Sequence, residues 1–135
     1  MSGRRKGREL AIQMLYQWDV AAQPVGKVLE SFWRLGEQPE AARSFARRLV
    51  EGTIANSGEI DALISEHAEH WRMERMATVD RNVLRLAVFE FLYEDTPTKV
   101  VINEALEITK KYSTPDAVQF INGILDAVRL RLEAH

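Results

Sequence analysis

The stretch TVDRNVLRLAVFEFLYE, residues 78–94, decides the fold class. Its apolar residues spread around most of the circumference of a helix instead of forming one stripe. These residues are Val83, Leu84, Leu86, Ala87, Val88, Phe89, Phe91 and Leu92. A helix of this kind is usually buried among other helices. We therefore expect residues 78–94 to form an enclosed helix of an all-α protein, with Thr78 as its N-cap.

Helical spacing continues on both sides of this stretch, and no segment shows a sustained alternation of apolar and polar residues. The pattern predicts six further helices, at about residues 4–18, 25–35, 39–53, 57–71, 101–112 and 115–132. Thr114, Pro115 and Asp116 form a strong start signal for the last of them. Gly123 interrupts that helix and is expected to let a neighbouring helix approach closely.

Length and composition indicate one domain, residues 1–135, because 135 residues with 46% hydrophobic content are enough for a single core. The sequence contains no cysteine, which excludes disulfides, a thiolate nucleophile and cysteine-ligated metals. No apolar run approaches the ~18 residues of a membrane span, and the basic start lacks the pattern of a signal peptide. These features predict a cytoplasmic protein without a membrane segment.

Positive charge is concentrated at the start of the chain. Arg4, Arg5, Lys6 and Arg8 lie within the first eight residues, which contain no acid, although the net charge of the chain is −2. Cations are unfavourable beside the partial positive charge of a helix N-terminus, but together with its free N–H groups they form an anion site. Phosphate is the natural ligand, and a solvated basic tail is the alternative. A second basic group, Lys110 and Lys111, lies beside Tyr112, an aromatic residue on which a base could stack.

Nothing in the sequence indicates an enzyme. His67 and His70 have the spacing of two metal ligands on one helix, but no third ligand accompanies them. The serines lie outside any nucleophile elbow, and the scattered glycines form no phosphate-binding loop. We therefore expect no catalytic residues, no metal and no cofactor.

Four stretches together resemble the successive motifs of the NusB family of bacterial transcription antitermination factors. They are RELAIQMLYQWD (8–19), VDRNVLRLAVFEFLYE (79–94), TKVVINEALEITKKY (98–112) and FINGILDAV (120–128). The resemblance implies about seven helices in two packed halves and no catalysed reaction. It also implies that the chain, with the ribosomal small-subunit protein NusE, binds single-stranded boxA RNA in ribosomal RNA leaders. With other Nus factors, this assembly helps RNA polymerase pass termination signals.

The resemblance and the charge pattern together select candidate site residues. The candidates for RNA binding are Arg4, Arg5, Lys6, Arg8, Gln13, Tyr16, Lys111 and Asp116. Asp80 and Arg81 are predicted at the exposed start of their helix, as contacts for NusE. Asn103, Glu104 and Asn122 are interpreted as residues that orient the backbone between helices and do not touch a partner, the two asparagines as buried amides.

Two other functions are compatible with the sequence. The chain could be a helical protein-interaction module, like the domain fused to some RNA methyltransferases, or a self-associating dimer with weak or masked RNA binding. Both a monomer and a homodimer are therefore open. Ser113 and Gln119 depart from the family pattern, in which many relatives have glycine and a basic residue, so the basic start is expected to carry more of the electrostatics.

Overall fold

The structure, a computed structural model, describes residues 2–33, 36, 38–69 and 71–134. In these residues there are seven α-helices, one short 3-10 turn and no strand, which confirms the all-α prediction. The elements are α1 (Ser2–Ala21), α2 (Val25–Trp33), α3 (Glu40–Ala55), α4 (Ser57–His67), η1 (Met73–Arg75), α5 (Thr78–Tyr93), α6 (Thr98–Tyr112) and α7 (Pro115–Glu133). None of the described helices is both long and apolar enough to cross a membrane.

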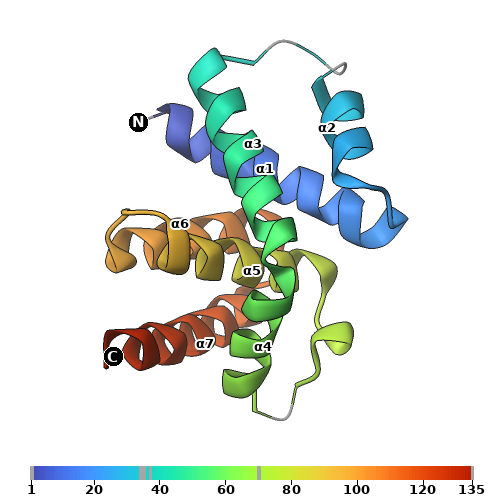
Figure 1. Cartoon of the computed structure of the whole chain (residues 1–135). Helices are drawn as coiled ribbons and strands as arrows, with labels where there is room; N and C mark the ends of the chain where they lie inside the picture. Colours follow the sequence, from blue (N-terminus) through green and yellow to red (C-terminus); the bar gives the residue numbers. More distant parts are fainter. Residues whose placement is uncertain (1, 34–35, 37, 70, 135) are drawn as a thin grey trace.

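The helices form two groups around one continuous core. Helices α1–α3 lie together at one end of the molecule and α4–α7 at the other (Figure 1). Helix α5 packs against α1, α3, α4, α6 and α7, so it joins the two groups. Every residue from 82 to 90 is buried, as the apolar pattern of this stretch predicted.

Several predicted helix ends differ from the structure. Thr78 is the first residue of α5 and not its cap, which is Ala77. Helix α6 begins at Thr98, directly after Pro97, because proline restricts the residue before it and not the residues that follow. Helix α4 ends at His67, four residues early. The predicted cap of α7 is confirmed, since the Thr114 hydroxyl oxygen accepts a hydrogen bond from the backbone N–H of Ala117, 3.2 Å away.

The predicted role of Gly123 is wrong, because a Cβ atom built there meets nothing within 4 Å. Close helix approaches occur at two other glycines. A Cβ on Gly52 would lie 2.3 Å from ring atoms of Phe89, where α3 crosses α5. A Cβ on Gly7 would lie 2.9 Å from the ring of Phe45, where α1 crosses α3. Both positions therefore need a residue without a side chain.

Candidate nucleic-acid interface

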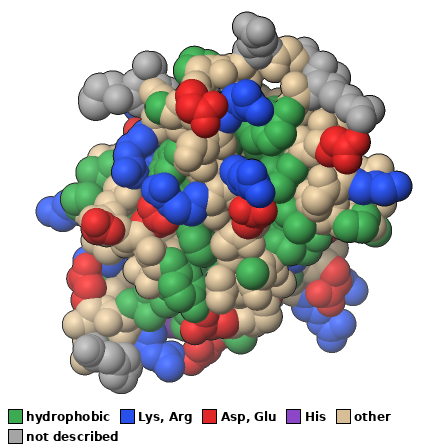
Figure 2. Space-filling view, turned by 45° about the horizontal axis from the view of Figure 1, so that its top comes forward, with side chains coloured by type: hydrophobic (Ala, Val, Ile, Leu, Met, Phe, Trp, Pro, Cys, Tyr) green, Lys and Arg blue, Asp and Glu red, His purple; other side chains and the backbone are tan. Residues whose placement is uncertain are grey.

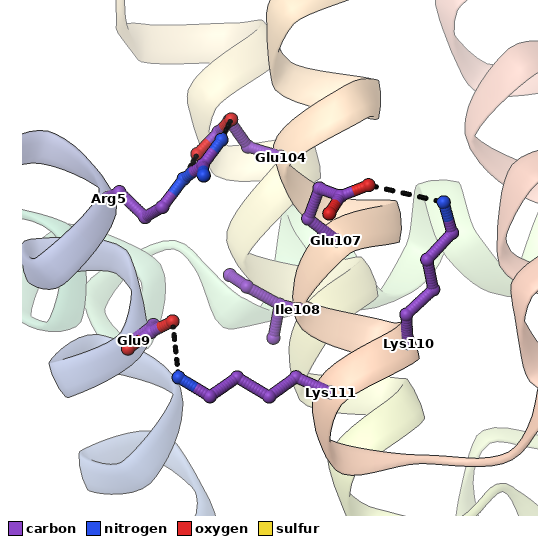
Figure 3. A pocket seen from close by; sticks show the side chains of 7 residues that line it. All are labelled: Arg5, Glu9, Glu104, Glu107, Ile108, Lys110 and Lys111. Carbon is purple, nitrogen blue, oxygen red and sulfur yellow. Dashed lines mark hydrogen bonds and ion pairs between the residues drawn. The ribbon is translucent and has the colours of Figure 1, made fainter.

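A groove between α1 and α6 contains two of the predicted RNA-binding residues, Arg5 and Lys111, and two more, Gln13 and Tyr16, lie further along α1. Arg5, Glu9, Gln13 and Tyr16 are spaced four, four and three residues apart, so they share one face of α1. The groove has a volume of about 400 Å³ and lies at the Arg5 end of this face (Figure 3). Its lining residues are Arg5, Glu9, Glu104, Glu107, Ile108, Lys110 and Lys111.

Each cation of the groove pairs with a carboxylate. Arg5 donates two hydrogen bonds to Glu104, at 3.2 and 2.8 Å. Lys111 donates to Glu9 at 3.0 Å, and Lys110 donates to Glu107 on its own helix at 3.2 Å. The hydrogen bond from Arg5, followed by its charge, lowers the pKa of the Glu104 carboxyl despite partial desolvation. Glu104 is therefore ionised at neutral pH.

A separate aromatic pocket lies further along α1. It has a volume of about 220 Å³ and is lined by Ile12, Gln13, Tyr16, Val79 and Tyr112. Tyr16 and Tyr112 are 44% and 39% exposed, so both can be reached from solvent. The Lys111 ammonium lies 5.4 Å from the centre of the Tyr112 ring, so the cationic and aromatic parts adjoin. Phosphates and unpaired bases need this combination of side chains.

The other clustered cations point in different directions. Lys6 is exposed and forms no ion pair with any residue that the structure describes. Arg4 is also exposed, but its guanidinium carbon lies 4.6 Å from the centre of the Phe45 ring, on the side of α3. Within the described chain, Arg4 and Lys6 are thus cations of α1 without an ion pair, and Arg4 lies on the α3 side, outside the α1–α6 groove.

Arg8 is not available for RNA, which corrects its prediction as a phosphate contact. Its side chain is 4% exposed and donates two hydrogen bonds of 2.8 Å to Glu90, which is 2% exposed. Desolvation lowers the pKa of Arg8, but the hydrogen bonds and charge of Glu90 outweigh it, so the pKa is raised. Arg8 lies three and seven residues before the buried Ala11 and Leu15, so it shares their face of α1. This spacing in the sequence already indicates that Arg8 faces the core.

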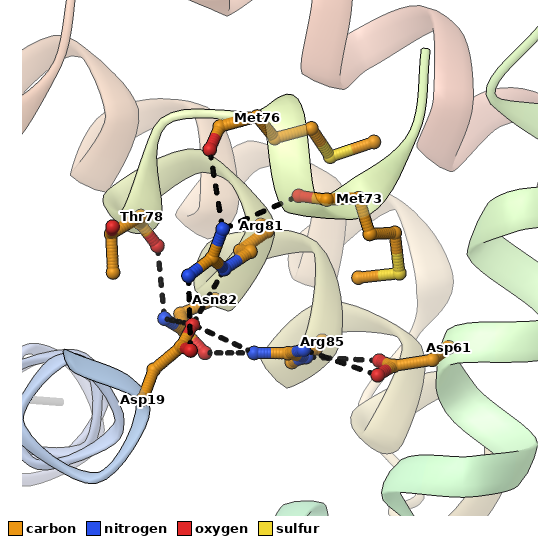
Figure 4. A network of polar contacts seen from close by, with 8 residues as sticks. All are labelled: Asp19, Asp61, Met73, Met76, Thr78, Arg81, Asn82 and Arg85. Atoms are coloured by element: carbon orange, nitrogen blue, oxygen red, sulfur yellow. Dashed lines mark hydrogen bonds and ion pairs between the residues drawn. The ribbon is translucent and has the colours of Figure 1, made fainter. Parts of the chain in front are cut away.

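Asp80 and Arg81 are not exposed, which is a second correction. Asp80 is buried and accepts a hydrogen bond of 2.6 Å from the hydroxyl of Ser113. Arg81 donates to both carboxylate oxygens of Asp19, at 2.6 and 3.0 Å (Figure 4). The end of α1 and the α6–α7 junction cover the start of α5, and a sequence pattern within α5 does not show them.

Asp19 lies at the centre of a polar network that sequence reasoning missed. It also accepts hydrogen bonds from Asn82 and Arg85, each 3.0 Å long. Arg85 in turn donates to Asp61 on α4, at 2.9 and 3.1 Å (Figure 4). The network therefore ties α1, α4 and α5 together. The sequence did contain an indication of this network. Helix α5 has apolar residues on all sides and is therefore enclosed, so its arginine and asparagine side chains must be buried and need hydrogen-bond partners.

Asp116 lies outside the α1–α6 groove. It is exposed and lines a separate groove of about 290 Å³ with Trp71, Arg75, Met76, Ala77, Asp80, Thr114, Ala117 and Phe120. Trp71 is 53% exposed, and its ring centre lies 5.8 Å from that of Phe120. Asn103 and Asn122 are exposed, so their interpretation as buried amides is wrong.

The described residues contain no group of three side chains that could hold a metal. His67 has its Nδ1 atom 2.9 Å from the carbonyl oxygen of Leu63, as expected of a semi-buried histidine. His70, the second histidine of the pair with metal-ligand spacing, lies outside the described residues.

Comparisons with known proteins agree with this architecture. A sequence model of the NusB family matches residues 5–129. A transcription antitermination protein NusB of Koribacter versatilis is 53% identical, covering 97% of this chain and 91% of that protein. One of Myxococcus xanthus is 46% identical, covering 98% of both. Both relatives are named as transcription antitermination proteins, in agreement with the prediction that the chain is not an enzyme.

Solved structures show the same fold. The NusB structure of T. maritima superposes with a TM-score of 0.86 at 37% identity, covering 94% of this chain and 90% of that one. A chain from a crystal structure of antitermination factors NusB and NusE in complex with double-stranded RNA superposes with a TM-score of 0.88 at 28% identity, covering 97% and 98%. The match of the family model, the near-complete coverage and the shared fold lead to one conclusion: this chain belongs to the NusB family of transcription antitermination proteins.

Proposed function

We propose that this chain binds boxA-type single-stranded RNA in ribosomal RNA leaders through the α1–α6 groove and its aromatic pocket. The observation that carries the proposal is that both features lie along one face of α1, which carries Arg5 at the groove and Tyr16 at the aromatic pocket. At 1.5 Å per residue, they are about 16 Å apart along the helix, which is room for more than one nucleotide. The family assignment supports this proposal, and the complex of a structural relative with NusE and double-stranded RNA supports RNA as a ligand of this fold without bearing on the single strand.

The two parts of the surface would hold different parts of the RNA. Arg5, Lys6, Lys110 and Lys111 supply charge for phosphates, and this contribution is independent of sequence. Tyr16 and Tyr112 present ring faces on which bases stack, and the Gln13 amide has both a donor and an acceptor for a base edge. A duplex keeps its bases stacked and paired, so the pocket favours a single strand.

For the protein partner, we propose that NusE binds the face at the start of α5. Asp80 lies beneath this face. Arg81 holds the start of α5 in place by its hydrogen bonds to Asp19. The contact itself involves the exposed Trp71 and the partly buried Phe120 of the adjoining groove. A Trp71→Ala variant should therefore lose NusE affinity, whereas Trp33→Ala on α2 should keep it.

We propose that the assembly acts in the cytoplasm, together with other Nus factors and RNA polymerase.

Fluorescence anisotropy with a boxA-like RNA and a scrambled RNA of equal length tests RNA binding. Each RNA is titrated with and without NusE at several salt concentrations. The variants are Lys111→Ala in the groove and Lys27→Ala on α2 as the matched control. We expect a preference for boxA, and a log–log salt slope that becomes shallower by about 0.7 in Lys111→Ala only.

Equal affinity of wild type for both RNAs, or equal effects of the two lysine variants, would contradict the proposal. Light scattering over a range of protein concentrations then tests the self-associating alternative. A dimer that forms as RNA binding is lost would show that self-association masks the groove.

A further inference from the structure

The groove between α1 and α6 has two reciprocal ion pairs across it. Helix α1 supplies the cation Arg5 and the acid Glu9, and α6 supplies the acid Glu104 and the cation Lys111. In Figure 3, Arg5 and Lys111 each reach across to the acid on the opposite helix. The same donor atoms that would hold an RNA phosphate therefore already hold a carboxylate.

The acids are less exposed than the cations. The side chains of Glu104 and Glu9 are 16% and 15% exposed, whereas those of Arg5 and Lys111 are 60% and 55% exposed. The carboxylates thus lie low in the groove, and the cations extend from its rim. Because the Glu9 and Glu104 side chains are largely buried, they have little freedom to rotate out toward solvent. Their carboxylates therefore stay beside any anion that enters the groove.

The formal charges of the residues that line the groove sum to zero. Arg5, Lys110 and Lys111 are balanced by three acids, Glu9, Glu104 and Glu107. Positive and negative side chains are also interspersed on the face shown in Figure 2. Surface charges are screened within about 8 Å at physiological salt, so the groove exerts little attraction on a distant polyanion.

Stability does not account for this arrangement. Ion pairs with a largely exposed partner contribute little to the free energy of unfolding, because side-chain entropy and solvent offset the attraction. The pair of Arg8 and Glu90 is different, since both side chains are buried and each needs the other. Glu104 also forms an ion pair of 3.9 Å with Arg8, which is longer than the 2.8 Å hydrogen bonds between Arg8 and Glu90.

We propose that Glu9 and Glu104 compete with RNA phosphates for Lys111 and Arg5 and so lower the affinity of the groove for every RNA. By doing so they weaken sequence-independent RNA binding. RNA is then held only when base contacts in the aromatic pocket add to the phosphate contacts. This inference rests on the proposed RNA-binding function of the groove.

The size of the effect follows from electrostatics. A carboxylate about 5 Å from a phosphate in water-like surroundings weakens its binding about threefold to fourfold. Removing one carboxylate should therefore strengthen binding of any RNA by about threefold. The absolute affinity for a scrambled RNA is the sensitive measure, because sequence-specific base contacts do not contribute to it.

The test compares Glu104→Gln and Glu9→Gln with Glu66→Gln as a matched control. Glu66 on α4 pairs with Arg131 on α7, so its variant makes the same charge change in an exposed arginine pair outside the groove. Anisotropy titrations with scrambled and boxA-like RNA should give an affinity about threefold higher for each groove variant. The control should match wild type. Thermal unfolding confirms that all the variants are folded.

A double-mutant cycle tests whether Glu104 acts through Arg5. The gain from Glu104→Gln should largely vanish in an Arg5→Ala background. Weaker binding by Glu104→Gln would overturn the proposal and show that Glu104 positions Arg5 for the RNA. Unchanged affinity, or an equal gain in Glu66→Gln, would also overturn it.

Failure of the proposed function gives a different result. If neither wild type nor the variants bind either RNA, the groove is not an RNA site. Heparin, a polyanion without bases, then decides the inference. Salt elution from a heparin column should occur later for Glu104→Gln than for Glu66→Gln, and equal elution would overturn the competition between carboxylate and anion.

Discussion

Arg8 on α1 and Glu90 on α5 form a doubly hydrogen-bonded ion pair in the interior, with both hydrogen bonds 2.8 Å long. They are 82 residues apart in the sequence and connect the N-terminal group of helices to the central helix. Removal of one partner leaves an uncompensated buried charge. Arg8 thus belongs to the core, although it is one of four clustered cations.

Arg8→Ala should therefore lower the free energy of unfolding by about 3–5 kcal/mol. Lys6→Ala should change it by less than about 0.5 kcal/mol, because its side chain is exposed. Urea denaturation measures both. Replacing both partners, as Arg8→Met with Glu90→Leu, should recover most of the loss. Full stability of Arg8→Ala together with weakened RNA binding would contradict this role.

Asp19 should make stability sensitive to acid. Desolvation raises its pKa, but hydrogen bonds from Arg81 and Asn82 and the charge of Arg85 outweigh it, so the pKa lies below the ordinary value of 3.8. A depressed carboxyl pKa contributes stability that is present above the unfolded value and is lost as pH falls through the folded one. Urea midpoints of wild type should therefore decrease below about pH 4.5.

Asp19→Asn should be less stable at neutral pH and show a smaller decrease on acidification. Asp95→Asn, which changes an exposed carboxyl outside the network, is the matched control and should follow the wild-type curve. Parallel acid curves for wild type and Asp19→Asn would show that the network does not carry this dependence.

Gly52 and Gly123 should respond in opposite ways to alanine. At Gly52 the added Cβ meets the Phe89 ring at 2.3 Å, so overpacking should cost about 1–3 kcal/mol. At Gly123 nothing lies within 4 Å, so the helix propensity of alanine should stabilise the protein by about 0.5–1 kcal/mol. Thermal unfolding distinguishes the two. Combining Gly52→Ala with Phe89→Leu should relieve the clash, and an additive loss would argue against this contact.

Tyr16 and Tyr112 should contribute base stacking. Alanine at either position should weaken boxA binding by about 1–3 kcal/mol without changing the salt slope, since no charge is removed. Phenylalanine should preserve affinity because it keeps the ring. Tyr93→Ala is the control. Tyr93 is similarly exposed but lies at the end of α5, whereas the aromatic pocket lies at the start of that helix. If Tyr16→Phe were as weak as Tyr16→Ala, the hydroxyl and not the ring would be the contact.

The helices and the core were largely predictable from the sequence. The six apolar positions predicted for α3 follow from spacing alone, because a helix places residues three and four apart on one face. All of them are buried: Ala42, Phe45, Ala46, Leu49, Val50 and Thr53. The enclosed position of α5 and the Thr114 cap follow equally from local sequence. The family motifs likewise depend on residue order and not on contacts.

The tertiary structure decided which charged residues remain available for binding. Arg5 and Arg8 both appear in the sequence as members of one basic cluster, yet Arg5 extends into solvent beside Glu104 and Arg8 is buried against Glu90. Asp80 and Arg81 were placed at an exposed helix start, but Ser113 and Asp19 cover them. Periodicity identifies the face of a helix on which a side chain lies. The element that packs against that face depends on how distant helices cross, so the environment of each charge is set by residues far away in the chain.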